Sequence, residues 1–448
     1  MLLKLFVPIT PLIIFFYSNL LFGQNKSTAL DISNQKLKTL PNDVFSHTHL
    51  IMLRANNNLL EELPPQIMNL TSLEFLMLEK NELKELPPEI GKLSALRTLW
   101  LNHNRLSKLP ETIGQLKKLK ALWLNHNLLT QLPFSIGELE SLESLWLNQN
   151  RLTELPPTIG KLKNLKSLYL WNNQLQNLPE TIGDLESLQS LHLWQNQLTT
   201  LPVSIGKLKN LLELNASNNL IQKLPETIVE LENLLEFNIG NNQLSTLPAS
   251  IGNLNKLQAL YIWNNHLDSL PQSITKLQHL HSLHAEGNRI KTLPSEIGKL
   301  KNLQSLLLEG NQLQELPKSI GKLSKLEVLW VNNNHLHILP SEIGELKNLR
   351  ELYAGGNQLK TIPVQIGNLK NLHSLWLAQN QITILPPEVG ELKQLVELNL
   401  SKNYLTTLPE SIKKLANHLQ FLNLHGNPIP ENEKQKIKSW LPYTTITW

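Results

Sequence analysis

The chain has 448 residues, no cysteine and 103 leucines, so leucine fills about 23% of all positions. The absence of cysteine excludes disulfide bonds, thiolate metal sites and cysteine nucleophiles. The 41 Lys and Arg against 37 Asp and Glu give a formal charge of +4, and the charges alternate in sign without the basic stripe that nucleic acid requires. We therefore expect no nucleic-acid partner, and the even spread of leucine favours one repeated unit over several separate domains.

The N-terminal segment differs in composition from the rest of the chain. Lys4 is its one charge, an apolar run covers residues 5–16, and residues 20–22 lead to the small residue Gly23. This pattern predicts a secretory signal peptide over residues 1–23. An uncleaved membrane anchor is the alternative, because residues 5–22 approach the minimum length of a membrane span. The expected location is accordingly secreted or in the cell envelope.

From Leu30 onward the sequence repeats with a period of 23 residues. One asparagine marks each copy, at positions 58, 81, 104, 127, 150, 173, 196, 219, 242, 265, 288, 311, 334, 357, 380 and 403, and then at 427 after a one-residue insertion. In the first copy Gln35 takes its place. The open ends of a repeat array must be covered. We assign residues 24–45 to an N-terminal cap and first repeat turn, 46–427 to the repeats, and 428–448 to a C-terminal cap.

Each copy contains leucines at alternate positions, such as Leu76 and Leu78, with the period of a half-buried strand. The full register, L-x-x-L-x-L-x-x-N-x-L followed by L-P-x-x-I-G-x-L, resembles the leucine-rich repeat family over residues 30–427. The resemblance implies an α/β solenoid, a curved horseshoe with a concave parallel β-sheet and short convex helical or 3-10 arms. Many animal extracellular members have cysteine-bonded caps, which this chain lacks, so together with the signal peptide the resemblance is to a bacterial exported member.

The asparagine column and the Ile-Gly pairs both have structural interpretations. An amide side chain carries a donor and an acceptor, so it can satisfy backbone groups that become buried where the chain turns inward. We expect these asparagines to form a structural ladder and not a ligand site. Met68, Val229, Thr275 and Lys413 replace the glycine of the Ile-Gly pair. We expect an altered convex backbone in those four copies.

Function is expected at positions that the scaffold leaves free, namely the outward residues of the concave face. These residues precede each asparagine by four and by two positions, and eight of the ten tryptophans fall in these two columns. The predicted partner-binding residues are Trp100, Trp123, Trp146, Tyr169, Trp171, Trp194, Tyr261, Trp263, Glu286, Glu309, Trp330, Tyr353 and Trp376.

The predicted binding residues fall into an N-terminal cluster that ends at Trp194 and a C-terminal cluster that begins at Tyr261. A polar window separates the two clusters and consists of Glu213, Asn215, Ser217, Glu236, Asn238 and Gly240. We expect the aromatic side chains to face solvent, as a binding surface requires. A purely structural role is the alternative, because aromatic pairs across strands stabilise a sheet by about 0.2 to 1 kcal/mol each.

Catalysis finds no support in the sequence. The 14 histidines are scattered, and there is no phosphate-binding glycine loop, no G-x-S-x-G and no H-E-x-x-H motif. We expect no enzyme activity, no cofactor and no bound metal. The predicted function is a monomeric scaffold whose concave aromatic face holds a protein or an extended glycan. The repeat also resembles that of intracellular scaffolds which bind small Ras-type GTPases, so a cytoplasmic signalling adaptor is the alternative.

Overall fold

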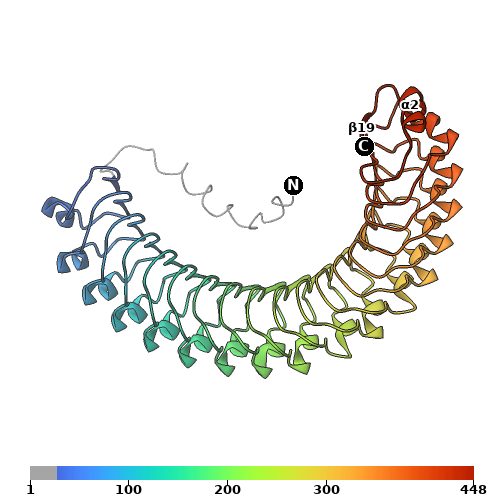
Figure 1. Cartoon of the computed structure of the whole chain (residues 1–448). Helices are drawn as coiled ribbons and strands as arrows, with labels where there is room; N and C mark the ends of the chain where they lie inside the picture. Colours follow the sequence, from blue (N-terminus) through green and yellow to red (C-terminus); the bar gives the residue numbers. More distant parts are fainter. Residues whose placement is uncertain (1–27) are drawn as a thin grey trace.

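A computed structural model describes residues 28–448, which form one curved solenoid (Figure 1). The strands line the inner, concave side of the curve and short helical turns line the outer side. The predicted signal peptide, residues 1–23, lies outside the described residues. Within residues 28–448, no helix combines the length and the apolar character needed to cross a bilayer.

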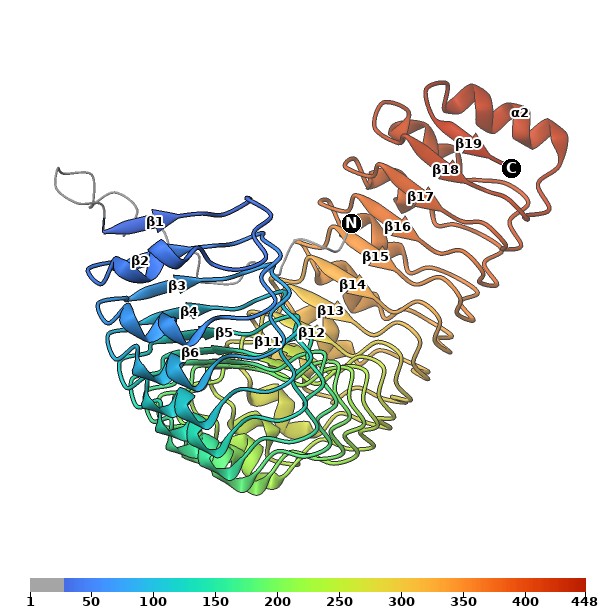
Figure 2. The same ribbon diagram turned by 90° about the vertical axis from the view of Figure 1, so that its left-hand side faces the viewer.

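The concave side is a single sheet of 19 strands in which each strand pairs in parallel with the next one along the chain (Figure 2). Every strand has three residues. The strands are β1 Ala29–Asp31, β2 Met52–Arg54, β3 Phe75–Met77, β4 Thr98–Trp100, β5 Ala121–Trp123, β6 Ser144–Trp146, β7 Ser167–Tyr169, β8 Ser190–His192, β9 Glu213–Asn215, β10 Glu236–Asn238, β11 Ala259–Tyr261, β12 Ser282–His284, β13 Ser305–Leu307, β14 Val328–Trp330, β15 Glu351–Tyr353, β16 Ser374–Trp376, β17 Glu397–Asn399, β18 Phe421–Asn423 and β19 Thr445–Thr447.

The convex side consists of one short 3-10 helix per repeat, and most of these arms begin directly after a proline. The arms are η1 Asn42–Ser46, η2 Pro65–Asn69, η3 Pro88–Lys92, η4 Glu111–Gln115, η5 Phe134–Glu138, η6 Pro157–Lys161, η7 Glu180–Asp184, η8 Val203–Lys207, η9 Glu226–Glu230, η10 Ile251–Asn253, η11 Gln272–Lys276, η12 Ile297–Lys299, η13 Lys318–Lys322, η14 Ser341–Glu345, η15 Val364–Asn368, η16 Pro387–Glu391 and η17 Glu410–Leu415. The predicted horseshoe with a concave parallel sheet and convex 3-10 arms is confirmed.

One continuous apolar core runs through the solenoid, from Ile32 to Leu441. The central residue of a strand points inward, as Leu99 and Leu122 do, and both are fully buried. No single repeat can bury these leucines alone, so the stacking of neighbouring repeats supplies the core. At the C-terminal end, α2 (Glu431–Trp440) contributes the buried residue Ile437 to the core.

The asparagine ladder is confirmed as a structural device, and Asn104 illustrates it. Its Nδ2 donates to the carbonyl oxygens of Leu78 at 2.9 Å and Leu101 at 3.1 Å, and its Oδ1 accepts from the N–H of Leu83 at 3.0 Å. Leu78 and Leu83 belong to the preceding repeat, so the amide joins two repeats. The sixteen ladder asparagines from Asn58 to Asn403 are all buried.

The glycines of the Ile-Gly pairs allow neighbouring arms to approach each other. A Cβ on Gly183, for example, would lie 2.2 Å from the carbonyl oxygen of Ser204 in the next arm. Val229 and Thr275 do carry a Cβ, and the arms that follow them, η10 and η12, have three residues where most have five. We expected the alteration in the copy that lacks the glycine. At Val229 and Thr275 it falls on the next copy, whereas at Lys413 the copy's own arm, η17, is altered and has six residues.

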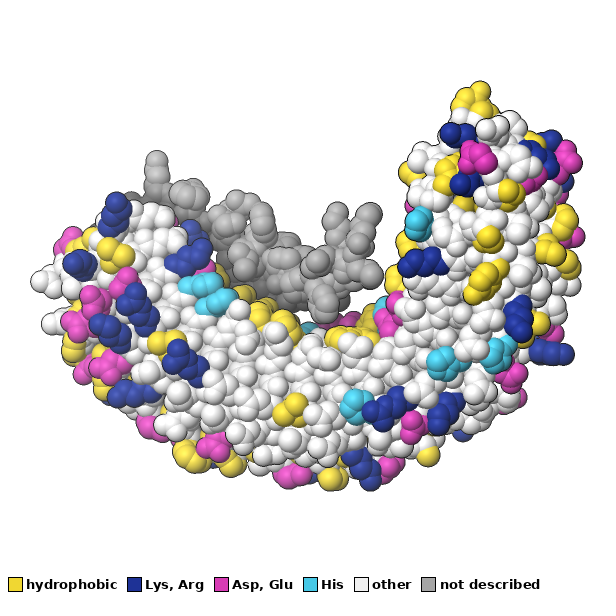
Figure 3. Space-filling model, in the orientation of Figure 1, with side chains coloured by type: hydrophobic (Ala, Val, Ile, Leu, Met, Phe, Trp, Pro, Cys, Tyr) yellow, Lys and Arg dark blue, Asp and Glu magenta, His cyan; other side chains and the backbone are white. Residues whose placement is uncertain are grey.

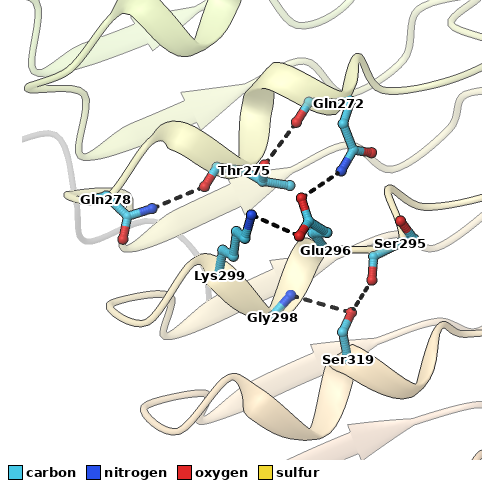
Figure 4. Close-up of polar contacts among 8 residues, drawn as sticks. All are labelled: Gln272, Thr275, Gln278, Ser295, Glu296, Gly298, Lys299 and Ser319. Carbon is cyan, nitrogen blue, oxygen red and sulfur yellow. Dashed lines mark hydrogen bonds and ion pairs between the residues drawn. The ribbon is translucent and has the colours of Figure 1, made fainter.

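The region around Thr275 shows how the protein accommodates the missing glycine (Figure 4). The hydroxyl of Thr275 donates to the carbonyl oxygen of Gln272 within its own arm at 2.8 Å. In the shortened arm, the side chain of Glu296 pairs with Lys299 at 2.7 Å and accepts from Gln272 at 3.5 Å. Side-chain contacts thus connect the two arms where close backbone contact is lost. The arm that follows Met68, η3, keeps its five residues.

Candidate functional site

The concave face presents three columns of outward residues, which precede each ladder asparagine by six, four and two positions. On β5, for instance, Ala121 and Trp123 flank the buried Leu122, and Asn125 follows the strand. The structure places all thirteen predicted binding residues in the second and third columns. The first column was missed as a set, although strand alternation indicates it, because its residues lie two positions before the second column. It contributes Glu213, Glu236, Glu351 and Glu397.

The aromatic rings of the N-terminal cluster stack along the sheet. The centroids of Trp123 and Trp146 lie 4.5 Å apart with an interplanar angle of 5°, and those of Trp146 and Tyr169 lie 3.9 Å apart. His192 continues the column at 4.7 Å from Tyr169, whereas Trp100 meets Trp123 edge to face. In the third column, Trp171 and Trp194 stack at 4.5 Å. The ring spacing follows the strand spacing of about 4.8 Å.

The C-terminal cluster has a second stacked column. Tyr353 lies between Trp330 and Trp376, with ring centroids 5.1 Å and 4.8 Å away. The indole N–H of Trp330 donates to Glu351 at 3.2 Å, and that of Trp376 donates to Glu397 at 3.4 Å. The first-column carboxylates thus fix the orientation of the tryptophans.

Because the rings stack, the aromatic side chains are less exposed to solvent than we expected. Trp376, at 40% exposed, is the one predicted aromatic residue classed as exposed, and the others are half-buried. The expectation that the rings face solvent is therefore wrong for most of them. Within the stacked columns each ring covers the face of its neighbour, so mainly ring edges are open there.

The polar window is partly closed. Asn215 and Asn238 are buried, and the Oδ1 of each accepts from the backbone N–H two residues further on, in Ser217 and Gly240. Gly240 is covered by the indole of Trp263. Trp263 therefore leans across the window and forms one of its walls.

Two carboxylates of the window lie directly opposite each other on neighbouring strands, Glu213 on β9 and Glu236 on β10. Glu213 lies 3.5 Å from Nε2 of His192, and the hydrogen bond between these side chains lowers the pKa of Glu213. Burial, aided by the charge of Glu213, raises the pKa of Glu236. The window is therefore negatively charged and only partly compensated.

A second carboxylate pair consists of Glu286 and Glu309, which follow β12 and β13 in the third column. Burial, with a smaller effect of Glu309, raises the pKa of Glu286 to about 7. The Oε2 atom of Glu286 is shielded from solvent and has no hydrogen-bond partner. Burial lowers the pKa of the nearby His284 to about 4, so this imidazole is neutral at physiological pH. Between β3 and β17 the three columns hold seven carboxylates, Glu79, Glu213, Glu236, Glu286, Glu309, Glu351 and Glu397.

Chemically, this face offers ring edges and carboxylates over a long concave surface, while the indole N–H groups of Trp330 and Trp376 are held by Glu351 and Glu397. Across residues 28–448, no three His, Asp or Glu side chains are grouped so that they could hold a metal ion. The arrangement suits recognition of a large partner.

The 23-residue repeat, the buried asparagine ladder and the 3-10 arms define a solenoid of leucine-rich repeats. Sequence models agree, with a leucine-rich repeat region over residues 66–154 and 285–361 and leucine rich repeats over 140–198, 163–221, 186–244 and 255–313. Further repeats match over 347–388 and 394–415. Comparison with curated proteins gives no match.

Several solved structures are similar to this chain. A leucine-rich repeat protein of Leptospira interrogans is 39% identical, with 94% of this chain and 95% of that chain covered and a TM-score of 0.76. The ectodomain of the Arabidopsis thaliana receptor kinase GASSHO1/SCHENGEN3, in complex with Casparian strip integrity factor 2, is 33% identical over 91% of this chain and 51% of that chain, with a TM-score of 0.75. The plant peptide hormone receptor RGFR1, in complex with RGF2, is 32% identical over 87% of this chain and 72% of that chain, with a TM-score of 0.67. The chain therefore belongs to the leucine-rich repeat family, whose members are typically protein-binding scaffolds and generally non-catalytic.

Proposed function

We propose that this protein is a non-catalytic scaffold that binds a protein partner through its concave face. The observation that carries the proposal is the pair of stacked aromatic columns, centred on Trp146 and Tyr353. Trp123 and Trp330 lie nine strands apart, roughly 40 Å along the sheet before curvature shortens the span. A partner that contacts both clusters must be a macromolecule. Two similar plant receptors were solved with a peptide hormone or a protein factor, which supports a polypeptide partner.

The ring geometry favours a protein over an extended glycan. A sugar ring binds an aromatic side chain by laying its C–H groups on an open ring face, which carries the negative part of the ring quadrupole. Trp146, Tyr169 and Tyr353 have a neighbouring ring on both faces, so their edges are what a partner meets. Ring edges carry the positive part of the quadrupole and attract carbonyl oxygens, which a polypeptide backbone supplies along its whole length.

Alanine substitutions at the two clusters test this function. Trp123→Ala and Trp330→Ala should weaken capture of the partner from the native environment by about 2 kcal/mol or more, because aromatic anchors carry much of the affinity at interfaces. Phe134→Ala is the matched control, since it removes an aromatic ring that is 64% exposed on the convex arm η5. Protease treatment of the captured material should abolish binding, and glycosidase treatment should not. A large fall in melting temperature with intact capture would instead make the columns a sheet-stabilising device.

We also propose that the protein is a bacterial protein exported to the cell envelope or beyond it. The apolar segment before Gly23 supports export, and the similarity to the Leptospira protein supports a bacterial origin. N-terminal sequencing of the mature protein should find a start at or within a few residues of Gln24. An intact Met1 on soluble cytoplasmic protein would contradict export and would favour the intracellular adaptor.

A further inference from the structure

The concave face carries negative charge without matching positive charge. From β3 to β17, its three columns hold the seven carboxylates and no lysine or arginine, although the whole chain has a net charge of +4. In this part of the chain, the ion pairs of lysine and arginine lie outside the columns, as between Lys120 and Glu143 at 2.9 Å. Figure 3 shows that side chains of both signs are mixed over the side of the solenoid that faces the viewer. The concave face is thus an acidic strip on a slightly basic protein.

The four central carboxylates form two like-charged pairs on either side of Trp263. Glu213 and Glu236 lie opposite each other before it, and Glu286 and Glu309 come after it. Like charges directly opposite each other destabilise a sheet, so stability gives no reason for this arrangement. Within the described residues, His192 is the one basic side chain within ion-pair distance of any of the four.

In the second pair, Glu286 and Glu309, the carboxylate of Glu286 lacks a compensating positive charge among the described residues. The Oε2 atom of Glu286 lies shielded from solvent without a hydrogen-bond partner, and a buried carboxylate is costly unless it is paired. The neutral imidazole of His284 supplies no positive charge at physiological pH. Pairing with a cationic group of a binding partner would therefore offset the free-energy cost of burying this unpaired carboxylate.

Resting on the proposed protein-binding function, we propose that the centre of the concave face, at Glu213, Glu236, Glu286 and Glu309, binds a basic segment of the partner protein. Lysine or arginine side chains pair with both carboxylate pairs, and the indole of Trp263 between them offers a surface for a cation–π contact. Glu236 and Glu286 are two strands apart across the sheet, roughly 10 Å at about 4.8 Å per strand, and four positions apart along the strand direction, roughly 13 Å at about 3.3 Å per residue, so about 16 Å separates them. An extended segment covers that distance in about five residues.

The test uses a defined probe, a fluorescein-labelled octalysine peptide, with octaglutamate and a glycine-serine octapeptide as references. Binding is measured by fluorescence anisotropy at low salt. The concave variant E213Q/E236Q/E286Q/E309Q removes the two pairs. The control variant E62Q/E154Q/E226Q/E315Q removes the same charge from four exposed positions outside the columns. Circular dichroism checks that both variants are folded.

Octalysine should bind the wild type and the control variant, and should bind the concave variant at least about tenfold more weakly. Equal binding to both variants, or binding no tighter than that of the glycine-serine peptide, would overturn the proposal. The proposed function has a separate readout. If Trp123→Ala weakens partner capture while octalysine does not distinguish the variants, the protein-binding face stands and the basic segment is refuted.

Discussion

The indole of Trp263 lies against the backbone of Gly240, so that a Cβ built on Gly240 would be 2.3 Å from Cε2 of that ring. Gly240 is buried although it belongs to an outward column, because the indole covers it. The absence of a side chain at Gly240, two residues after β10, therefore sets the orientation of the aromatic ring that follows β11. This contact places Trp263 between the two carboxylate pairs.

Gly240→Ala should displace the indole of Trp263 without unfolding the protein. The ring is half-buried and can rotate towards solvent, so the loss of stability should stay below about 1 kcal/mol. The tryptophan emission should shift to longer wavelength as this indole becomes hydrated. Gly355→Ala, in the same column but with no ring above it, should leave the emission unchanged. Identical spectra for both variants and the wild type would contradict the contact.

Asn219→Ala should destabilise the middle of the array. Asn219 donates to the carbonyl oxygens of Leu193 at 3.0 Å and Ala216 at 3.1 Å and accepts from the N–H of Leu198 at 3.0 Å. Its loss leaves buried backbone groups unpaired, which costs about 1 to 3 kcal/mol in urea unfolding. The exposed Asn177 provides the control, because its replacement by alanine should cost no more than about 0.5 kcal/mol. Equal costs at both positions would exclude the ladder as a source of stability.

Gly183→Ala tests the close approach of the convex arms. The added Cβ would lie 2.2 Å from the carbonyl oxygen of Ser204, and both groups are held by their arms. Overpacking of this kind costs about 1 to 3 kcal/mol, measurable as a lower midpoint of unfolding. Met68→Ala alters the same column where the side chain is 43% exposed, and should change stability by no more than about 0.5 kcal/mol. A neutral Gly183→Ala would show that the arms are not tightly packed.

The pH dependence of stability should reveal the carboxyl of Glu286. Its pKa rises from 4.5 to about 7 on folding, so between these pH values the folded state holds a proton that the unfolded state has lost. Stability therefore falls as pH rises from 4.5 to 7, by about 1 to 3 kcal/mol for this group, and stays level above that. Glu286→Gln should remove this fall, and the difference between the two unfolding curves isolates it from Glu213 and Glu236. Parallel pH profiles would contradict the raised pKa.

The 23-residue period is sufficient to predict the fold and the phase of each strand. It determines which leucine points inward, and one asparagine per copy marks the turn, so the pattern alone assigns Leu99 to the core and Asn104 to the ladder. The same phase puts the tryptophan columns on the concave face. Periodicity succeeds here because every copy has the same surroundings.

The details of the candidate site depend on contacts between copies, which the period does not encode. The half-burial of Trp146 arises from the rings of Trp123 and Tyr169, and the burial of Asn215 arises from its own turn. The shortened arms follow the copies with Val229 and Thr275, because the missing glycine acts on the next neighbour. Such effects need the side-chain geometry of two adjacent repeats.

The two shortened arms have a mechanical consequence for the horseshoe. Arms η10 and η12 pack less extensively on the arms that precede them than most other neighbours do, and they follow β10 and β12 in the chain, in the repeats that form the acidic centre of the concave face. A solenoid with equal contacts between all neighbouring repeats deforms evenly, whereas a solenoid with two weaker contacts deforms mainly at those two contacts. When the solenoid opens or closes around a large partner, the bending should therefore occur mainly at η10 and η12. The two segments that carry the aromatic clusters should then move as rigid bodies on either side.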